Sequence, residues 1–273
     1  MTPTTTSAST SPASLNGVHA LVTGGARGIG EAVARSLLAQ GARVTLLGRS
    51  EATLATAAKE LAGPAAQRDV AWVSADISSA AAVEAAFARA AERFGPVQVL
   101  VNNAGQAVSA PFGKTDSALW QQMIDVNLTG TFHCISAALP AMLTAGWGRI
   151  VNVASTAGLI GYPYVTAYCA AKHGVVGLTR ALALEVAKKG VTVNAVCPGY
   201  TETDIVRDAV ANIVAKTGRS EDEARAELAR RNPQGRLVQP QEVADTVLWL
   251  CQPGAGAVTG QSIAVAGGEV TVG

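Results

Sequence analysis

The chain alternates short apolar segments with longer amphipathic ones along nearly its whole length. Strands are expected at residues 18–23, 44–47, 70–75, 97–101, 150–153, 191–196 and 261–266. Helical patterns lie between them, at residues 31–40, 51–61, 80–94, 116–144, 165–188 and 241–250, with an irregularity expected near Pro140. Short apolar strands that alternate with helices indicate a parallel sheet covered on both faces. The pattern therefore predicts an α/β protein, a doubly wound parallel sheet in three α/β/α layers.

The composition agrees with a large aliphatic core. Hydrophobic residues make up 49% of the 273 residues and aromatic residues only 4%, which suits helices on a buried sheet better than an aromatic-rich β-sandwich. The net charge of +1 argues against a nucleic-acid-binding protein. No shift in composition suggests a second domain, so residues 15–273 are expected to form one.

Residues 1–14 differ from the rest because they are rich in Ser, Thr, Pro and Ala. They lack the apolar core of a secretory signal and are expected to be a disordered tail. No run of about 18 apolar residues is evident, so no membrane span is expected. These observations predict a cytoplasmic protein.

The four cysteines are widely separated, and each lies among apolar residues: Cys134, Cys169, Cys197 and Cys251. No Cys/His cluster has the spacing of a metal site, so buried thiols and no metal are expected.

A glycine-rich loop follows the first expected strand. It reads Gly24-Gly25-Ala26-Arg27-Gly28-Ile29-Gly30 and leads directly into a helical pattern. Glycines let a backbone approach a pyrophosphate, and a helix N-terminus attracts its charge. A simple tight turn is the alternative, but the strand–loop–helix context favours a nucleotide site.

Three further loops follow later strands. They are Asn102-Asn103-Ala104-Gly105, the loop at Ser155, and Pro198-Gly199. In open parallel sheets, ligands bind beyond the carboxyl ends of the strands. All four loops are therefore expected to meet at one edge of the sheet.

Tyr168 and Lys172 lie four residues apart in an expected helix, and therefore on one face of it. Ser155 ends the preceding strand. A hydroxyl, a phenol and an ammonium suit hydride transfer to or from a nicotinamide, because the alcohol proton must leave or return. A nearby ammonium is expected to lower the pKa of Tyr168, and Ser155 to bind the substrate oxygen. Lys172 is also placed to bond the nicotinamide ribose.

Other interpretations of these residues were weighed. Tyr168 alone could be a core tyrosine, but Tyr162 and Tyr164 have no lysine at the same spacing. Asn127 is either a helix kink or part of a water relay. The three histidines have no spacing typical of a catalytic triad.

Residues 203–232 are helical in pattern and densely charged. They are either a solvated helical pair or a lid over the substrate.

These motifs, in this order and spacing, resemble the single-domain short-chain dehydrogenases/reductases over residues 15–273. The resemblance implies a Rossmann fold, and a catalytic tetrad of Asn127, Ser155, Tyr168 and Lys172 in which the asparagine holds a water. It further implies a homotetramer. It implies cofactor contacts at Asp76, Ile77, Asn103, Ala104, Thr201 and Thr203.

The second expected strand ends at Leu47-Gly48-Arg49-Ser50, with no acid to bind a ribose 2′-hydroxyl. A guanidinium suits a 2′-phosphate, so NADP(H) is preferred over NAD(H), with Arg49 and Arg27 as candidates.

Several stretches resemble polyketide ketoreductases, 3-ketoacyl reductases and 3-hydroxyacyl-CoA dehydrogenases, among them the one from Gly235 to Pro240. A small carbonyl or alcohol substrate is expected, with a 3-oxoacyl or 3-hydroxyacyl thioester, CoA- or carrier-bound, as the preferred class. A cyclic ketone, a sugar or another alcohol is the alternative. A non-catalytic dinucleotide sensor is the alternative from another class, and a nucleotide-sugar epimerase is the nearest enzyme alternative.

Overall fold

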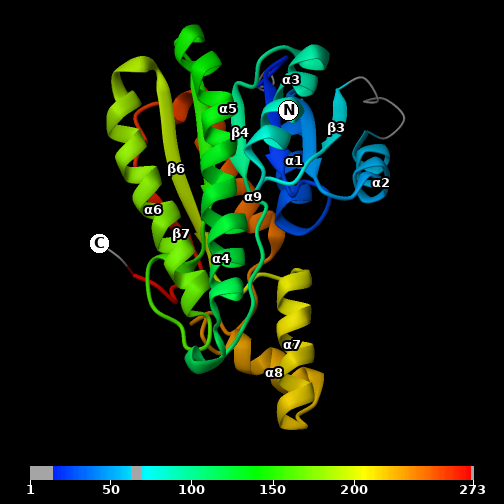
Figure 1. The fold of residues 1–273 in the computed structure, drawn as a ribbon, viewed down its shortest axis with the longest axis vertical. Coiled ribbons are helices and arrows are strands. Elements are labelled where there is room, and N and C mark those ends of the chain that lie inside the picture. Colours follow the sequence, from blue (N-terminus) through cyan, green and yellow to red (C-terminus); the bar gives the residue numbers. More distant parts are fainter. Residues whose placement is uncertain (1–14, 63–68, 272–273) are drawn as a thin grey trace, which may run out of the picture.

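The computed structural model describes residues 15–62 and 69–271, so the expected tail at 1–14 lies outside the described residues. Seven strands form one sheet in the order β3-β2-β1-β4-β5-β6-β7 (Figure 1). All pairings are parallel. The strands are β1 (His19–Thr23), β2 (Arg43–Gly48), β3 (Val70–Ser74), β4 (Val99–Asn102), β5 (Gly148–Val153), β6 (Val191–Pro198) and β7 (Ser262–Val265). The predicted doubly wound sheet is confirmed.

Helices cover both faces of the sheet. One face carries α1 (Gly28–Ala39), α2 (Glu51–Ala62) and α9 (Pro240–Cys251), and the other carries α3 (Ala80–Phe94), α5 (Gly130–Ala145) and α6 (Thr166–Val186). Alternate residues of each strand serve the two layers, because side chains on a strand point to opposite faces. In β1, Ala20 and Val22 pack with the first layer and Leu21 with the second.

A continuous helical stretch runs through α4 (Ser117–Ile124), a π-helical turn (Asp125–Thr129) and α5. The irregularity lies at this turn, where the Gly130 N–H bonds the Asp125 carbonyl, and the expectation of one near Pro140 is wrong. Pro140 is accommodated inside α5, and its carbonyl accepts a hydrogen bond from the Thr144 hydroxyl at 3.0 Å. At the end of this turn, Gly130 lies so close to Ile77 that a Cβ on the glycine would lie 2.7 Å from that side chain.

Residues 117–145 include an 18-residue window of mean hydropathy 1.2, so the helix is long and apolar enough to cross a membrane by length and composition. The sequence pattern predicts no such segment. One third of the window is buried. Cys134, Ala138 and Met142 pack against the sheet, whereas Trp120, Phe132 and Leu143 are exposed. The stretch therefore packs on the sheet with part of its apolar surface and leaves another part exposed.

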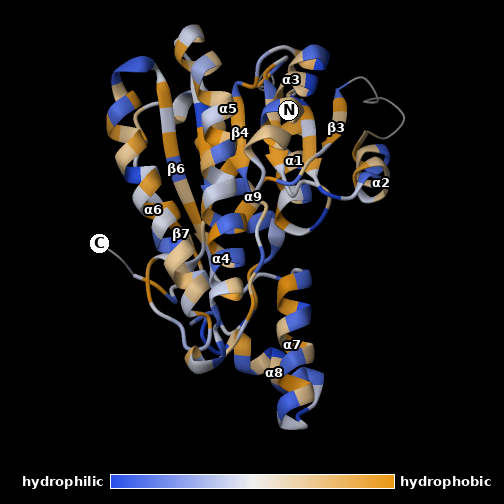
Figure 2. Cartoon of the chain, in the orientation of Figure 1, coloured by the Kyte–Doolittle hydropathy of each residue, from blue (hydrophilic) through white to orange (hydrophobic). Residues whose placement is uncertain are grey.

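Two helices extend from the main body, α7 (Asp204–Thr217) and α8 (Glu221–Ala229) (Figure 1). Ser220 and Glu223 form a capping box that starts α8. The pair has its own apolar cluster, which includes Val206, Val210 and Leu228 and is separate from the clusters on the sheet. Figure 2 shows polar and apolar residues interspersed along both helices. The predicted helical pair is therefore present.

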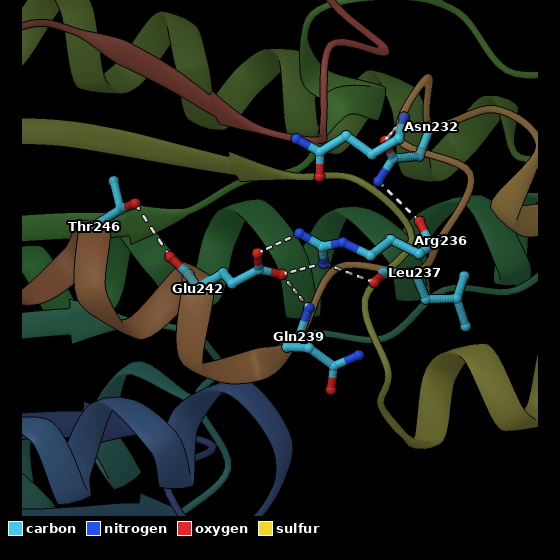
Figure 3. A network of polar contacts seen from close by, with 7 residues as sticks. Asn232, Arg236, Leu237, Gln239, Glu242 and Thr246 are labelled. Atoms are coloured by element: carbon cyan, nitrogen blue, oxygen red, sulfur yellow. Dashed lines mark hydrogen bonds and ion pairs between the residues drawn. The ribbon is translucent and has the colours of Figure 1, made fainter.

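The chain returns from this pair to the body through a polar network (Figure 3). The Arg236 guanidinium makes two bonds to the Glu242 carboxylate, at 2.7 and 2.6 Å. The Gln239 N–H donates to the same carboxylate at 2.8 Å, and Asn232 Nδ2 donates to the Arg236 carbonyl at 2.8 Å. The Arg236 bonds are the larger reason that the pKa of Glu242 falls to about 2. This network fixes the start of α9.

Short 3₁₀ turns complete the structure at Phe112–Lys114, Thr156–Gly158, Ala187–Lys189 and Pro253–Ala255.

Candidate active site

The four loops predicted to share an edge of the sheet follow β1, β4, β5 and β6, at the carboxyl ends of these strands. The strand order reverses between β1 and β4, because β1 continues toward β2 and β3 while β4 continues toward β5 and β6. The glycine loop and the Asn102–Gly105 turn flank this reversal. Such a switch point is where open α/β sheets bind ligands.

The glycine loop forms an open cradle. Gly24 and Gly28 have positive φ angles of 63° and 55°, which favour glycine. A Cβ on Gly30 would lie 2.3 Å from the Gly24 carbonyl oxygen. Helix α1 begins here without a side-chain cap from Arg27, so its first N–H groups face the loop. Unpaired N–H groups at a helix start suit a pyrophosphate, and Ile29 lies in that first turn.

The turn after β4 is tied to the glycine loop. Thr23 Oγ1 accepts hydrogen bonds from the Asn103 and Ala104 N–H groups, each at 3.0 Å. Asn103 Nδ2 donates to the Thr23 and Gly24 carbonyls at 3.0 and 3.2 Å. The two loops flanking the switch point are therefore held as one unit.

Asn127 lies in the π-helical turn and is fully buried. Its Nδ2 donates to the carbonyls of Gln106 and Met123 at 2.9 and 3.0 Å, and its Oδ1 accepts from the Gln106 N–H at 3.2 Å. A Cβ on Gly105 would lie 2.8 Å from this Oδ1 and 3.6 Å from Lys172 Nζ. The irregular turn thus places the asparagine close to the lysine, and the two interpretations of Asn127 are compatible.

Ser155, Tyr168 and Lys172 come together above β5. Lys172 is buried, its Nζ donates to the Val153 carbonyl at 2.9 Å, and it lies 5.6 Å from the centroid of the Tyr168 ring. Ser155 Oγ accepts from the Ala157 N–H at 3.1 Å, and the Ser155 side chain also bonds the Tyr168 hydroxyl. The hydroxyl, the phenol and the cation form one constellation.

The expected lowering of the Tyr168 pKa by Lys172 is wrong for the protein alone. Burial raises the pKa of Tyr168 to about 12, and the hydrogen bond with Ser155 only partly offsets it. Burial also lowers the pKa of Lys172 to about 8. The sequence shows that the two groups are neighbours, but it does not show that both are desolvated, and desolvation disfavours both charged forms.

The adenine-side candidates lie around the ends of β2 and β3. Asp76 is exposed and accepts bonds from the Ser78 N–H and hydroxyl, at 2.9 and 2.7 Å, which lower its pKa. Ile77 is buried against Gly130. The Arg49 guanidinium is exposed and close enough to Asp76 to contribute to that lowering.

Arg27 forms an exposed ion pair, since its Nη1 lies 2.9 Å from Asp204 Oδ2 and its side chain is 75% exposed. Asp204 is the first residue of α7 and also pairs with Arg207. The ion pair connects the glycine loop to the helical pair, a contact that sequence spacing did not indicate.

Pro198 ends β6, and the segment that follows leads to α7. The Gly199 N–H bonds the Val265 carbonyl at 3.1 Å. Thr201 Oγ1 bonds the Gly199 carbonyl, and Thr203 Oγ1 bonds the Thr201 carbonyl, at 3.0 and 3.1 Å. A Cβ on Gly28 would lie 3.3 Å from the Thr203 methyl group, so Thr203 borders the glycine loop.

Sequence reasoning missed a polar cluster beside Ser155, formed by Thr156, Tyr162, Tyr200, Arg231 and Glu269. No lysine follows Tyr162 at the spacing found for Tyr168, so the sequence pattern does not single it out. Its partners come from three other segments of the chain, so no local signal identifies the cluster. Within the described part of the chain, no three His, Cys, Asp or Glu side chains form a metal cluster.

Comparison with known proteins shows the family to which the chain belongs. The family model of the short chain dehydrogenases matches residues 18–213. A protein named as a ketoacyl reductase, from Streptomyces coelicolor, is 45% identical, covering 91% of this chain and 95% of its own. D-beta-hydroxybutyrate dehydrogenase of Cupriavidus necator is 40% identical, and the match covers 94% of this chain and 99% of that protein. The chain belongs to the short-chain dehydrogenase/reductase family.

Among solved structures, an actinorhodin polyketide ketoreductase variant with NADPH superposes with a TM-score of 0.88 at 43% identity. The match covers 92% of this chain and 97% of that one. The protein is accordingly an oxidoreductase of the ketone/alcohol class that uses a nicotinamide cofactor.

Proposed function

We propose that the protein is a reversible NADP(H)-dependent ketone reductase that works through Asn127, Ser155, Tyr168 and Lys172. The observation that carries the proposal is the constellation above β5, where Lys172 Nζ lies 5.6 Å from the Tyr168 ring and the Ser155 side chain bonds the phenol. The glycine cradle beside it fits a dinucleotide.

Each residue has a distinct task in this scheme. A nicotinamide supplies or accepts the hydride when it is bound. Ser155 binds the substrate oxygen, and Tyr168 gives that oxygen its proton in reduction and removes it in oxidation. Lys172 holds positive charge near the phenol, and Asn127 supports a water on the proton path to solvent. Because the pKa of Tyr168 is raised to about 12, the isolated protein is prepared for proton donation.

Replacing the phenol tests the assignment. Tyr168→Phe should lower kcat by about 10²–10⁴-fold, because proton transfer is lost, and should leave cofactor binding near normal. Tyr164→Phe is the matched control, since Tyr164 is 62% exposed. Retained turnover in Tyr168→Phe would remove the catalytic assignment.

We further propose that Arg49 and Arg27 select NADP(H). Arg49 stands at the end of β2 with an exposed guanidinium, where a guanidinium suits a 2′-phosphate. Arg49→Asp should weaken NADPH binding far more than NADH binding, measured by fluorescence titration of both cofactors. Equal losses for the two cofactors would show that Arg49 does not contact the phosphate.

For the substrate, we propose a 3-oxoacyl or 3-hydroxyacyl thioester, CoA- or carrier-bound. The names of several relatives support this class. They include an acetoacetyl-CoA reductase of Rhizobium meliloti, 39% identical over 92% of this chain and 97% of that protein. We assign α7 and α8 as the lid that selects it. Absorbance assays with acetoacetyl-CoA, carrier thioesters, cyclic ketones and sugars would rank these classes, and a marked preference for sugars would refute the proposal.

We also propose a homotetramer in the cytoplasm. Exposed apolar residues on α4, α5 and α6 support an interface there: Trp120, Phe132, Leu143 and Leu184. Leu184 is 82% exposed, which is unusual for a leucine facing solvent. Light scattering of wild type and Leu184→Glu would test the assembly, because a charge at an apolar interface should dissociate it.

A further inference from the structure

A polar cluster connects the C-terminal segment to the catalytic serine. Glu269 follows β7, Tyr162 lies between Ser155 and α6, and Thr156 directly follows Ser155. Tyr162 Oη lies 2.7 Å from Glu269 Oε1 and 2.8 Å from Thr156 Oγ1. Glu269 and Tyr162 are half-buried and Thr156 is 4% exposed. These contacts lie partly out of water, where hydrogen bonds are stronger.

The hydrogen bonds have a direction that the carboxylate determines. An ionised carboxylate only accepts, so the Tyr162 phenol must donate to Glu269. The phenol has one proton, and the Thr156 hydroxyl must therefore donate to the Tyr162 oxygen. The pKa of Tyr162 agrees, since burial and then Glu269 raise it while the bond from Thr156 lowers it.

Aromatic contacts hold Tyr162 in place. The Arg231 guanidinium lies 5.0 Å from the Tyr162 ring centroid, and the Tyr200 ring meets Tyr162 edge-on at 6.4 Å. Tyr200 also lies close enough to Tyr168 to influence its pKa. The cluster therefore borders the catalytic phenol as well as the serine turn.

We propose that Glu269 is a positioning residue which fixes the Ser155 turn through Tyr162 and Thr156. The Thr156 proton is committed to Tyr162, so the turn cannot rotate without breaking this chain of bonds. Ser155 Oγ accepts from the Ala157 N–H at 3.1 Å and the Ser155 side chain bonds the Tyr168 hydroxyl, so the turn sets where this oxygen lies beside the phenol. Glu269 thus acts on the reaction without touching the substrate oxygen, and the inference depends on the proposed role of Ser155.

The test is a double-mutant cycle on Glu269→Ala and Tyr162→Phe, with ethyl acetoacetate and acetoacetyl-CoA as substrates. Each single variant should lower kcat about tenfold, and the double variant should be no worse than either one, because both changes break one chain. NADPH affinity should stay within about twofold of wild type, since mispositioning of Ser155 affects only the chemical step. Glu269→Gln, which keeps an accepting oxygen, should recover kcat to within about threefold of wild type.

Glu84→Ala, which removes an exposed carboxylate of α3, is the matched control and should be unchanged. Wild-type kcat in Glu269→Ala, multiplicative losses in the double variant, a failed recovery in Glu269→Gln, or a parallel loss of NADPH binding would each overturn the proposal. Ser155→Ala separates a failure of the proposed function from a failure of the Glu269 proposal. Retained turnover in Ser155→Ala would refute the role of Ser155, whatever the double-mutant cycle shows. Circular dichroism confirms that each variant is folded.

Discussion

Replacing Lys172 by methionine should abolish turnover and at the same time stabilise the protein. Lys172 is 4% exposed and has no carboxylate beside it among the described residues, so the folded protein holds a poorly solvated ammonium. Burial lowers its pKa from 10.5 to about 8. At about 1.4 kcal/mol for each pH unit, this difference costs about 3 kcal/mol of folding free energy at neutral pH.

Methionine removes that cost and fills a similar volume, but it leaves the Val153 carbonyl without its hydrogen bond, a loss of about 1 kcal/mol. Lys172→Met should therefore be about 2 kcal/mol more stable than wild type at pH 7. Between pH 8 and 10.5 the unfolded chain keeps the lysine proton that the folded protein has lost, so the penalty shrinks as pH rises. The advantage should fall to about 1 kcal/mol at pH 9.

Urea unfolding at both pH values measures the difference between the two proteins, which cancels the titration of every other group. Lys59→Met, at an exposed position of α2, should show no pH-dependent difference. A Lys172→Met variant that is no more stable than wild type at pH 7, or whose advantage grows with pH, would refute the desolvation argument.

Three further outcomes follow from the site. Because the pKa of Tyr168 is about 12, initial rates of reduction should be constant from pH 6 to 8, whereas initial rates of oxidation should rise about tenfold per pH unit. An oxidation rate that falls as the pH rises would contradict the assignment. Gly105→Ala places a Cβ 2.8 Å from Asn127 Oδ1, so it should lower the free energy of unfolding in urea by about 1–3 kcal/mol and should lower kcat by more than this loss of stability explains. Gly113→Ala, whose Cβ would have nothing within 4 Å, is the control. His19 is buried and its pKa is lowered from 6.5, so the free energy of unfolding should fall as the pH drops below that value. His19→Gln should lose less stability over the same pH range, and equal acid sensitivity of the two proteins would exclude His19 as the cause.

The fold could be predicted because its determinants are periodic and local. Each expected strand was a short apolar run, and all seven are present with bounds shifted by a few residues. The edge at which the four loops gather also follows from topology alone. The π-helical turn could not be found this way, because Asp125–Thr129 show no local signal for it, and the closeness of Gly130 to Ile77 joins residues that are distant in sequence.

The proposed catalytic constellation could be predicted because Tyr168 and Lys172 belong to one helix and their spacing is fixed. Their ionisation was not visible, since the pKa of each depends on how completely the surrounding layers exclude water. Glu269 was missed for a related reason. Its partner Tyr162 is 107 residues away in the chain, and only the packing of β7 beside β6 brings the two together.

The separate apolar cluster of α7 and α8 has a consequence for how such a protein diversifies. Val206, Val210, Ala224, Leu228 and Leu237 pack on one another rather than on the sheet. Substitutions on the outer faces of this pair can therefore accumulate without weakening the layers that hold Tyr168 and Lys172. In the proposed scheme, in which α7 and α8 select the substrate, selection and chemistry rest on different hydrophobic cores, so a change in one leaves the other intact.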